Sequence, residues 1–128
     1  MATYLWVALG SALGGVARFA CSNLAARWLG EEFPWGTLAI NVLGSFVIGL
    51  FAVLTGPGGP IAVTPDARRF VMVGVCGGYT TFSAFSLHTF GFLQAGDLGR
   101  ASLNIVASVT LCVLATWAGF AASAALAR

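Results

Sequence analysis

The sequence predicts an all-α membrane protein with four transmembrane helices, the third of which is broken near the middle of the membrane. Three observations lead to this prediction. Of the 128 residues, 59% are hydrophobic and only 8% are charged, whereas a soluble domain carries roughly 25% charged residues. Four apolar stretches each approach or exceed the roughly 20 residues that a helix needs to cross the hydrocarbon core. The third stretch contains a run of glycine and threonine that disfavours a continuous helix.

The four spans are expected to form one transmembrane domain over residues 1–128. The first apolar stretch lacks the positive flank of a signal peptide and is too long for the apolar core of one, so we expect it to be a mature helix. Glycine, proline and acidic residues gather between the stretches and mark the loops. The predicted spans are about 5–28, 35–54, 67–94 with a break near 77–80, and 100–126.

Composition excludes several classes of function. The net charge is only +2, and the basic residues form no stripe with interleaved aromatics, which argues against a nucleic-acid partner. The three cysteines all lie in apolar stretches without a CxxC pair or a cysteine–histidine cluster, so free thiols are expected and no zinc site. No nucleophile accompanies a base and no carboxylates are paired, so the protein is not expected to be an enzyme.

The interruption in the third span is predicted from Gly77 and Gly78, which are followed by Thr80 and Thr81. Paired glycines are unfavourable in a helix interior, and threonine is a good residue to begin a new helix. We therefore expect two half-helices, since irregular backbone at this depth persists where it lines a cavity or is buried in protein. The alternative is a continuous helix in which the glycines serve close packing.

Such a break offers sites for ions of both signs. The first half-helix ends in free carbonyls that favour a cation, and Gly77 and Thr80 are the natural donors. The second half-helix begins with an end that favours negative charge. Phe82 and Phe85 follow on one face, and the edges of phenyl rings carry partial positive charge that an anion can contact. Aromatic stripes of this kind also occur in ordinary helix packing.

Neutral polar side chains occur on the other spans. Asn41 is the only amide of the second span and shares a helical stripe with Thr37. A buried amide needs partners, so Asn41 either bonds a neighbouring helix or donates to an anion. Ser108 lies on a similar stripe of the fourth span together with Asn104 and Cys112, and there a hydroxyl can equally bond its own backbone. No acidic residue lies within a span, which argues against proton-coupled transport.

The arginines are nearly balanced across the membrane, which removes the usual signal for orientation. A chain without a preferred orientation can insert both ways and form an antiparallel homodimer. Small residues four positions apart, such as Gly10 and Gly14, also favour close helix association. With four spans, one side carries Arg68, Arg69 and Arg128, and the other carries Arg27 and Arg100, with Arg18 nearer to that second side.

Three motifs resemble the signatures of the Fluc (CrcB) fluoride channels. Residues 14–18 read GGVAR and resemble the GGxxR signature of the first helix. Residues 36–44 read GTLAINVLG and are similar to GTLxxNxxG in the second helix. Residues 74–86 read GVCGGYTTFSAFS and resemble GxxGGxTTFSTFS, the most specific of the three. The motifs occur in the same order and spacing as in the family and cover the first three helices.

The resemblance implies a fluoride-specific channel that exports fluoride passively from the cytoplasm and so protects the cell. It also implies an antiparallel, dual-topology homodimer with two pores, in lipid of the plasma membrane, which is the inner membrane of a bacterium. It further implies a structural sodium ion, which backbone carbonyls would hold at the dimer centre and which would not be transported. The implied residues are Asn41, Phe82, Phe85 and Ser108 along the fluoride path, Thr37 near the pore mouth, Arg18 in the vestibule, and Gly77 and Thr80 at the sodium.

Four positions depart from the family pattern and affect the outer pore more than its centre. Ala84 replaces threonine, His88 and Asn104 stand where some members have glutamate and tyrosine, and Cys112 stands where some have serine. His88 suggests a mild pH sensitivity of conduction. Two rival functions remain. A small multidrug-resistance exchanger needs a carboxylate buried in the first helix, which this chain lacks, and a structural membrane subunit would not explain the break.

Overall fold

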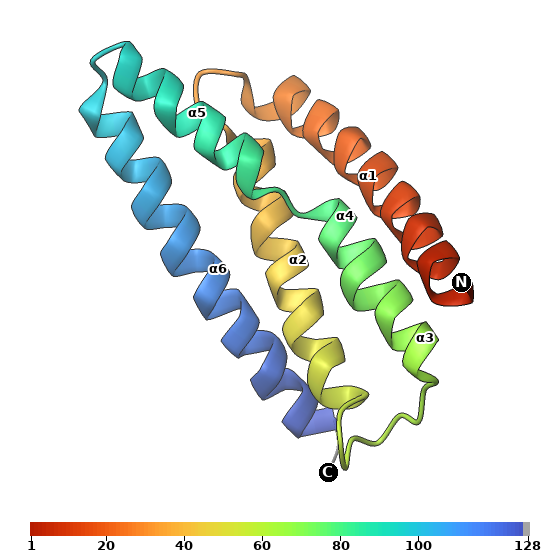
Figure 1. The fold of residues 1–128 in the computed structure, drawn as a ribbon. Coiled ribbons are helices and arrows are strands. Elements are labelled where there is room, and N and C mark those ends of the chain that lie inside the picture. Colours follow the sequence, from red (N-terminus) through yellow and green to blue (C-terminus); the bar gives the residue numbers. More distant parts are fainter. Residues whose placement is uncertain (127–128) are drawn as a thin grey trace.

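Residues 1–126, which the computed structural model describes, form a bundle of helices without a strand (Figure 1). Four helical segments in this part are long and apolar enough to cross a membrane. Arg128, one of the arginines counted for orientation, lies outside the described residues. The elements are α1 (Ala2–Leu29), α2 (Trp35–Leu54), α3 (Pro65–Arg69), the π-helix η1 (Phe70–Cys76), α4 (Gly77–Tyr79), α5 (Phe82–Gln94) and α6 (Leu98–Leu126).

The chain passes back and forth along the bundle, so the N-terminus and the end of α6 lie at the same end (Figure 1). The third segment is composite. Its first half, from α3 to α4, runs beside α1, and its second half, α5, packs against α6. An extended stretch joins the two halves and passes α2 near the middle of the bundle (Figure 1). The fold therefore contains four membrane-length segments with a bent third segment.

The outer helices are longer than the sequence pattern indicates, because polar contacts stabilise their first turns. α6 begins at Leu98 rather than near Arg100, and the Arg100 N–H donates to Asp97 Oδ1 at 2.9 Å. This bond satisfies one of the free amides at the helix start. α1 begins at Ala2 rather than near residue 5, and Thr3 Oγ1 donates to Asp66 Oδ1 at 2.8 Å. The start of α1 is thereby joined to α3.

Glycines allow α1 to approach the first half of the third segment at backbone distance. A Cβ atom at Gly14 would overlap the Val75 carbonyl oxygen and lie 2.8 Å from the Tyr79 nitrogen. A Cβ atom at Gly78 would lie 2.6 Å from the Ser11 carbonyl oxygen. Membrane helices gain stability from such close packing, because lipid supplies no hydrophobic force between them. The small-residue spacing in the sequence therefore marks a contact within one chain.

The outer surface of the bundle is apolar, as expected for a protein surrounded by lipid. Large side chains such as Leu13, Val106 and Trp117 are more than half exposed and point away from the bundle. In water, an apolar surface of this extent would drive association or aggregation. The interior is correspondingly thin, and it contains both buried apolar residues such as Ile40 and buried polar ones such as Asn104.

Candidate ion pathway at the broken helix

The interruption of the third segment lies at Thr80 and Thr81. Both residues have extended backbone, with φ and ψ of −80° and 159° at Thr80 and −152° and 112° at Thr81. Thr81 is the N-cap of α5, and its Oγ1 accepts a hydrogen bond from the Ala84 N–H at 3.2 Å. Gly77 and Gly78, which the sequence placed within the break, remain helical. They do so because Gly78 is needed for the close contact with α1.

Asn41 of α2 pairs with both backbone groups of Thr81. Its Oδ1 accepts from the Thr81 N–H at 2.7 Å, and its Nδ2 donates to the Thr81 carbonyl oxygen at 3.0 Å. The amide side chain thus takes the place of a backbone partner at a point where the helix provides none. Such pairing meets the demand that buried backbone groups be hydrogen-bonded.

Two carbonyls near the break lose their usual helical donors. In a continuous helix the Gly77 carbonyl would accept from the Thr81 N–H, and the Thr80 carbonyl from the Ala84 N–H. The first of these amides donates to Asn41 and the second to the Thr81 hydroxyl. The preceding bond is still made, since the Thr80 N–H donates to the Cys76 carbonyl at 3.0 Å. The Gly77 and Thr80 oxygens therefore lack these donors.

Gly44 provides the room for this extended segment against α2. It lies one turn after Asn41 on the same helix, and a Cβ atom there would overlap Thr80 Cγ2 and lie 3.4 Å from Tyr79 Cδ1. Thr80 cannot easily turn away, because its Oγ1 donates to the Cys76 carbonyl at 2.9 Å. Both polar and small residues of the second-helix motif thus contact the break.

A cavity of about 430 Å³, here called the break cavity, opens beside this segment. It brings together six of the eight residues predicted for ion sites. No charged side chain lines it within the described chain. Its lining comprises Asn41, Gly44, Ser45, Ile48, Cys76, Gly77, Thr80, Thr81, Phe82, Phe85, Ser108, Val109, Cys112 and Val113.

The two phenylalanines of the break cavity differ in exposure. Their ring centroids lie 5.2 Å apart with the planes tilted by 47°. Phe85 is 9% exposed and is fixed by packing, whereas Phe82 is 77% exposed within the single chain. Both rings line the break cavity, so the partly positive edges of a fixed ring (Phe85) and of an exposed ring (Phe82) are candidates for contact with an anion.

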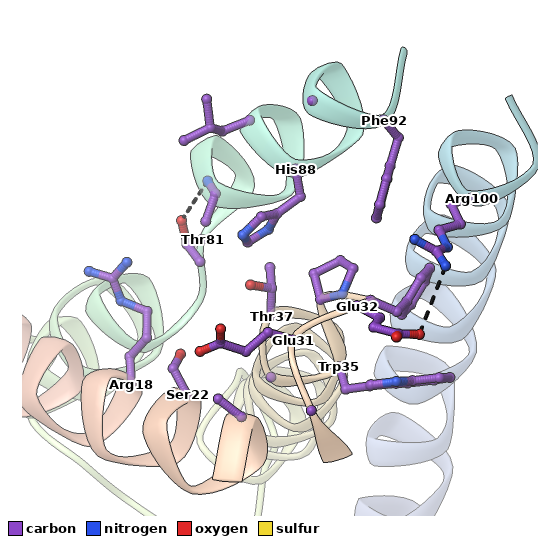
Figure 2. Close-up of a pocket in the computed structure, with 18 of the residues that line it drawn as sticks. Arg18, Ser22, Glu31, Glu32, Trp35, Thr37, Thr81, His88, Phe92 and Arg100 are labelled. Carbon is purple, nitrogen blue, oxygen red and sulfur yellow. Dashed lines mark hydrogen bonds and ion pairs between the residues drawn. The ribbon is translucent and has the colours of Figure 1, made fainter. Parts of the chain in front are cut away.

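Thr37 and Arg18, the other two predicted residues, line a second and larger cavity of about 970 Å³, here called the vestibule cavity (Figure 2). It lies where the loop between α1 and α2 approaches α5 and the start of α6. Thr81, which lies in the extended stretch of the third segment, lines both cavities and is the residue that their linings have in common. His88 of α5 also points into the vestibule cavity, near Thr37 (Figure 2).

The two arginines of the vestibule cavity are in different electrostatic situations. Arg100 lies 3.5 Å from Asp97 and 3.9 Å from Glu32, so its charge is largely balanced. Arg18 forms no ion pair with any residue of the described chain, and its Nε is buried without a hydrogen-bond partner there. Arg18 is therefore an unpaired cation of this cavity, whose lining also includes Glu31, a carboxylate without an ion pair in the described chain.

Two residues have roles that the sequence pattern did not indicate. Thr81 was considered as a helix start, and the structure adds its contact with Asn41 and its place on both cavities. Asn104, counted as part of a polar stripe, is 2% exposed and donates to Thr89 Oγ1 at 2.9 Å. Thr89 in turn donates to the Phe85 carbonyl at 2.9 Å. Asn104 thus joins α6 to α5 behind Phe85, whereas its stripe neighbour Cys112 lines the break cavity.

Known proteins are similar to this chain along nearly its whole length. A protein from Opitutus terrae named fluoride-specific ion channel FluC is 56% identical over 126 residues, which are 98% of this chain and 96% of that one. Proteins of the same name from Methylocella silvestris and Rhodospirillum rubrum are 51% and 54% identical. These matches cover 96% and 91% of this chain, and 94% and 91% of the relatives.

The family match covers the same region as the four helices. Residues 5–120 match the family described as CrcB-like protein, Camphor Resistance (CrcB). This range includes both cavities and the broken third segment. The chain therefore belongs to the CrcB family, as a multi-pass membrane protein whose polar residues converge on a break in its third helix.

Proposed function

We propose that this chain is a fluoride-specific ion channel that lets fluoride leave the cytoplasm passively. The proposal rests on membership of a family whose close relatives bear that name, and on the lining of the break cavity. The observation that carries most weight is the meeting of Asn41, Phe82, Phe85 and Ser108 around one neutral cavity beside a helix break. This is a transport function, and we assign no catalysis to the chain.

The chemistry of the break cavity suits a small, strongly hydrated anion. Replacing the water around fluoride requires several weak donors, which the Asn41 amide, the Ser108 hydroxyl and the phenyl edges supply. The start of α5 adds a favourable helix end. A fixed cation here would hold the ion too tightly for release, and no charged residue of the described chain lines the cavity.

The vestibule cavity supports entry of the anion. Arg18 carries a positive charge that no carboxylate of the described chain pairs with, and a fixed positive charge raises the concentration of anions close to it. Thr37 lies between this cavity and Asn41, one helical turn from the amide. A fluoride ion would therefore meet Arg18 first, then Thr37, and then the amide of Asn41.

Transport of this kind needs no coupling to protons. The four acidic residues, Glu31, Glu32, Asp66 and Asp97, lie in loops or at helix starts, away from the middle of the spans. Efflux would be driven by the inside-negative potential, which is worth about 2.3 kcal/mol per charge at 100 mV. The inner membrane of a bacterium, which is its plasma membrane, has such a potential and is the location we propose.

We further propose that the working unit is an antiparallel homodimer with two pores. In a single chain the break cavity is open on one side, Phe82 is 77% exposed and Gly77 is exposed. A second copy would close the cavity, and the balanced arginines would allow it to insert in the opposite orientation. Labelling of a tagged C-terminus from each side of the membrane tests this arrangement. Labelling from one side only would contradict it.

A structural sodium ion at the dimer centre is the remaining part of the proposal. The Gly77 and Thr80 carbonyls lack their usual helical donors, and both residues line the break cavity. Neutral carbonyl oxygens suit a hard monovalent cation, and unwound backbone supplies such ligands in sodium-coupled membrane proteins. No cluster of three acidic, histidine or cysteine residues occurs in the described chain, so these carbonyls are the fitting ligands. The ion would be structural and would not be transported.

Fluoride efflux from liposomes tests the channel function. Vesicles loaded with potassium fluoride and treated with valinomycin should release fluoride rapidly. Matched vesicles loaded with potassium chloride should release no chloride. The variant Phe82→Ile should release fluoride at least tenfold more slowly, because a branched alkyl group lacks the positive phenyl edge. Thr116→Val is a suitable control, since the Thr116 hydroxyl is exposed and bonds only the Cys112 carbonyl of its own helix. A folded wild-type protein without fluoride release would instead favour a structural membrane subunit.

A further inference from the structure

Asn41 has a contact that a simple pore donor would not need. Its Oδ1 accepts from the Thr81 N–H at 2.7 Å, the shorter of its two bonds to that residue. This amide proton is the one that would return to the Gly77 carbonyl if the helix continued. Since the Thr80 N–H still bonds Cys76, the helical pattern ends at the residue whose N–H donates to Asn41.

The local alternatives differ in where the Thr81 N–H donates. Without a partner on α2, this N–H is left unpaired in a low-dielectric region, which is costly. Its nearest way to recover a bond is for Thr80 to take helical angles, which would extend α4 by one residue and return the Thr81 N–H to the Gly77 carbonyl. With Asn41 present, Thr80 is extended and the Thr81 N–H donates to Asn41 instead of the Gly77 carbonyl.

We propose that Asn41 is a positioning residue for the sodium ion, in addition to lining the fluoride path. By accepting the Thr81 N–H, it keeps the Gly77 carbonyl available for the cation. The inference rests on the proposed sodium site. The Nδ2 group has two protons, of which the Thr81 carbonyl takes one, so the same side chain retains one donor for an anion. One amide would thus link the cation site to the anion path.

Stability as a function of sodium concentration tests this role without relying on transport. The purified protein in detergent is unfolded by heat at sodium concentrations from micromolar to 0.3 M, with N-methylglucamine replacing sodium. Sodium should raise the midpoint of the wild type, because a ligand that binds only the folded state stabilises it. In Asn41→Leu, which has similar volume and no polar atoms, the sodium concentration that gives half of this effect should rise at least tenfold.

Further variants separate the roles of the two amide atoms and of the pore. Asn41→Asp keeps an acceptor for the Thr81 N–H and should retain a sodium response within threefold of wild type. Phe82→Ile should reduce fluoride release and leave the sodium response unchanged. The control Thr116→Val should leave both measurements at the wild-type level. If Asn41→Leu yields no folded protein, Asn41→Ala takes its place with the same expected loss.

Three results would overturn the inference. A wild-type sodium response in Asn41→Leu together with lost fluoride release would make Asn41 a pore donor only. Loss of the response in Asn41→Asp would mean that accepting the Thr81 N–H is not what matters. If the thermal unfolding midpoint of the wild type did not change with sodium concentration, the proposed sodium site would be refuted. The fluoride efflux assay would still test the channel function independently.

Discussion

Replacement of Gly14 by alanine is the sharpest test of how the third segment is held. The added Cβ would overlap the Val75 carbonyl oxygen, lie 2.8 Å from the Tyr79 nitrogen and 3.1 Å from the Gly78 carbonyl carbon. All three are backbone atoms, so no side chain can rotate away. Reaching ordinary contact distances requires α1 and the first half-helix to separate by roughly 1 Å or more, and overpacking of this kind costs about 1–3 kcal/mol.

The intrinsic preference of alanine for helix acts in the opposite direction. Exchange of glycine for alanine in a helix gains about 1 kcal/mol. Gly91 provides the matched control, because it is a helix-interior glycine of α5 with nothing within 4 Å of its added Cβ. We therefore expect Gly91→Ala to be neutral or stabilising, and Gly14→Ala to lose up to about 2 kcal/mol relative to wild type.

Equilibrium unfolding in mixed detergent micelles measures this difference through the fluorescence of the four tryptophans. A loss of about 1.4 kcal/mol corresponds to a tenfold change in the unfolding equilibrium. Fluoride release should also fall in Gly14→Ala, because a displacement of α4 would move Thr80, which follows it and lines the break cavity. If Gly14→Ala proved as stable as Gly91→Ala, the backbone contact between α1 and the third segment would not exist as described.

Two further predictions concern the polar residues around the pathway. In a double-mutant cycle, Asn104→Leu and Thr89→Val should show a coupling of about 0.6 kcal/mol in the same unfolding assay, the average for hydrogen bonds within membranes. Additive effects of the two changes would argue against that bond. Arg18→Gln should slow fluoride release about threefold at 10 mM ionic strength, since a charge about 7 Å away in water is worth roughly 0.6 kcal/mol. The difference should shrink at 0.3 M salt, where screening is strong, and the exposed Arg27→Gln should show no such salt-dependent loss.

The residue types around the break were predictable from the sequence, whereas their exact placement depends on helix packing. Glycine and threonine in the third stretch predicted a break, and the break exists. The extended residues are Thr80 and Thr81, at the end of the predicted range 77–80, because Gly78 packs against the Ser11 backbone of α1 and stays helical together with Gly77. Asn41 was expected either to bond a neighbouring helix or to face an anion, and it bonds the third segment while also lining the break cavity.

Some features have no local signal at all. The π-helical geometry of η1 is not marked by any residue type in its sequence. The burial of Asn104 against Thr89 joins residues 15 positions apart, and only the packing of α5 on α6 selects that pair. The contact of Arg100 with Glu32, at 3.9 Å, likewise depends on how the loop between α1 and α2 approaches α6.

The sequence by itself determined the solvent, the four spans, the presence of a break and the family, because hydrophobic length, helix propensity and short motifs are properties of neighbouring residues. Only the tertiary structure decided which backbone groups stay unpaired at the break and which charges stay unbalanced at the vestibule. The reason is that Asn41 and Thr81 are 40 positions apart. A hydrogen bond over that separation exists only once the helices have packed, and it decides which carbonyls at the break lack their usual helical donors.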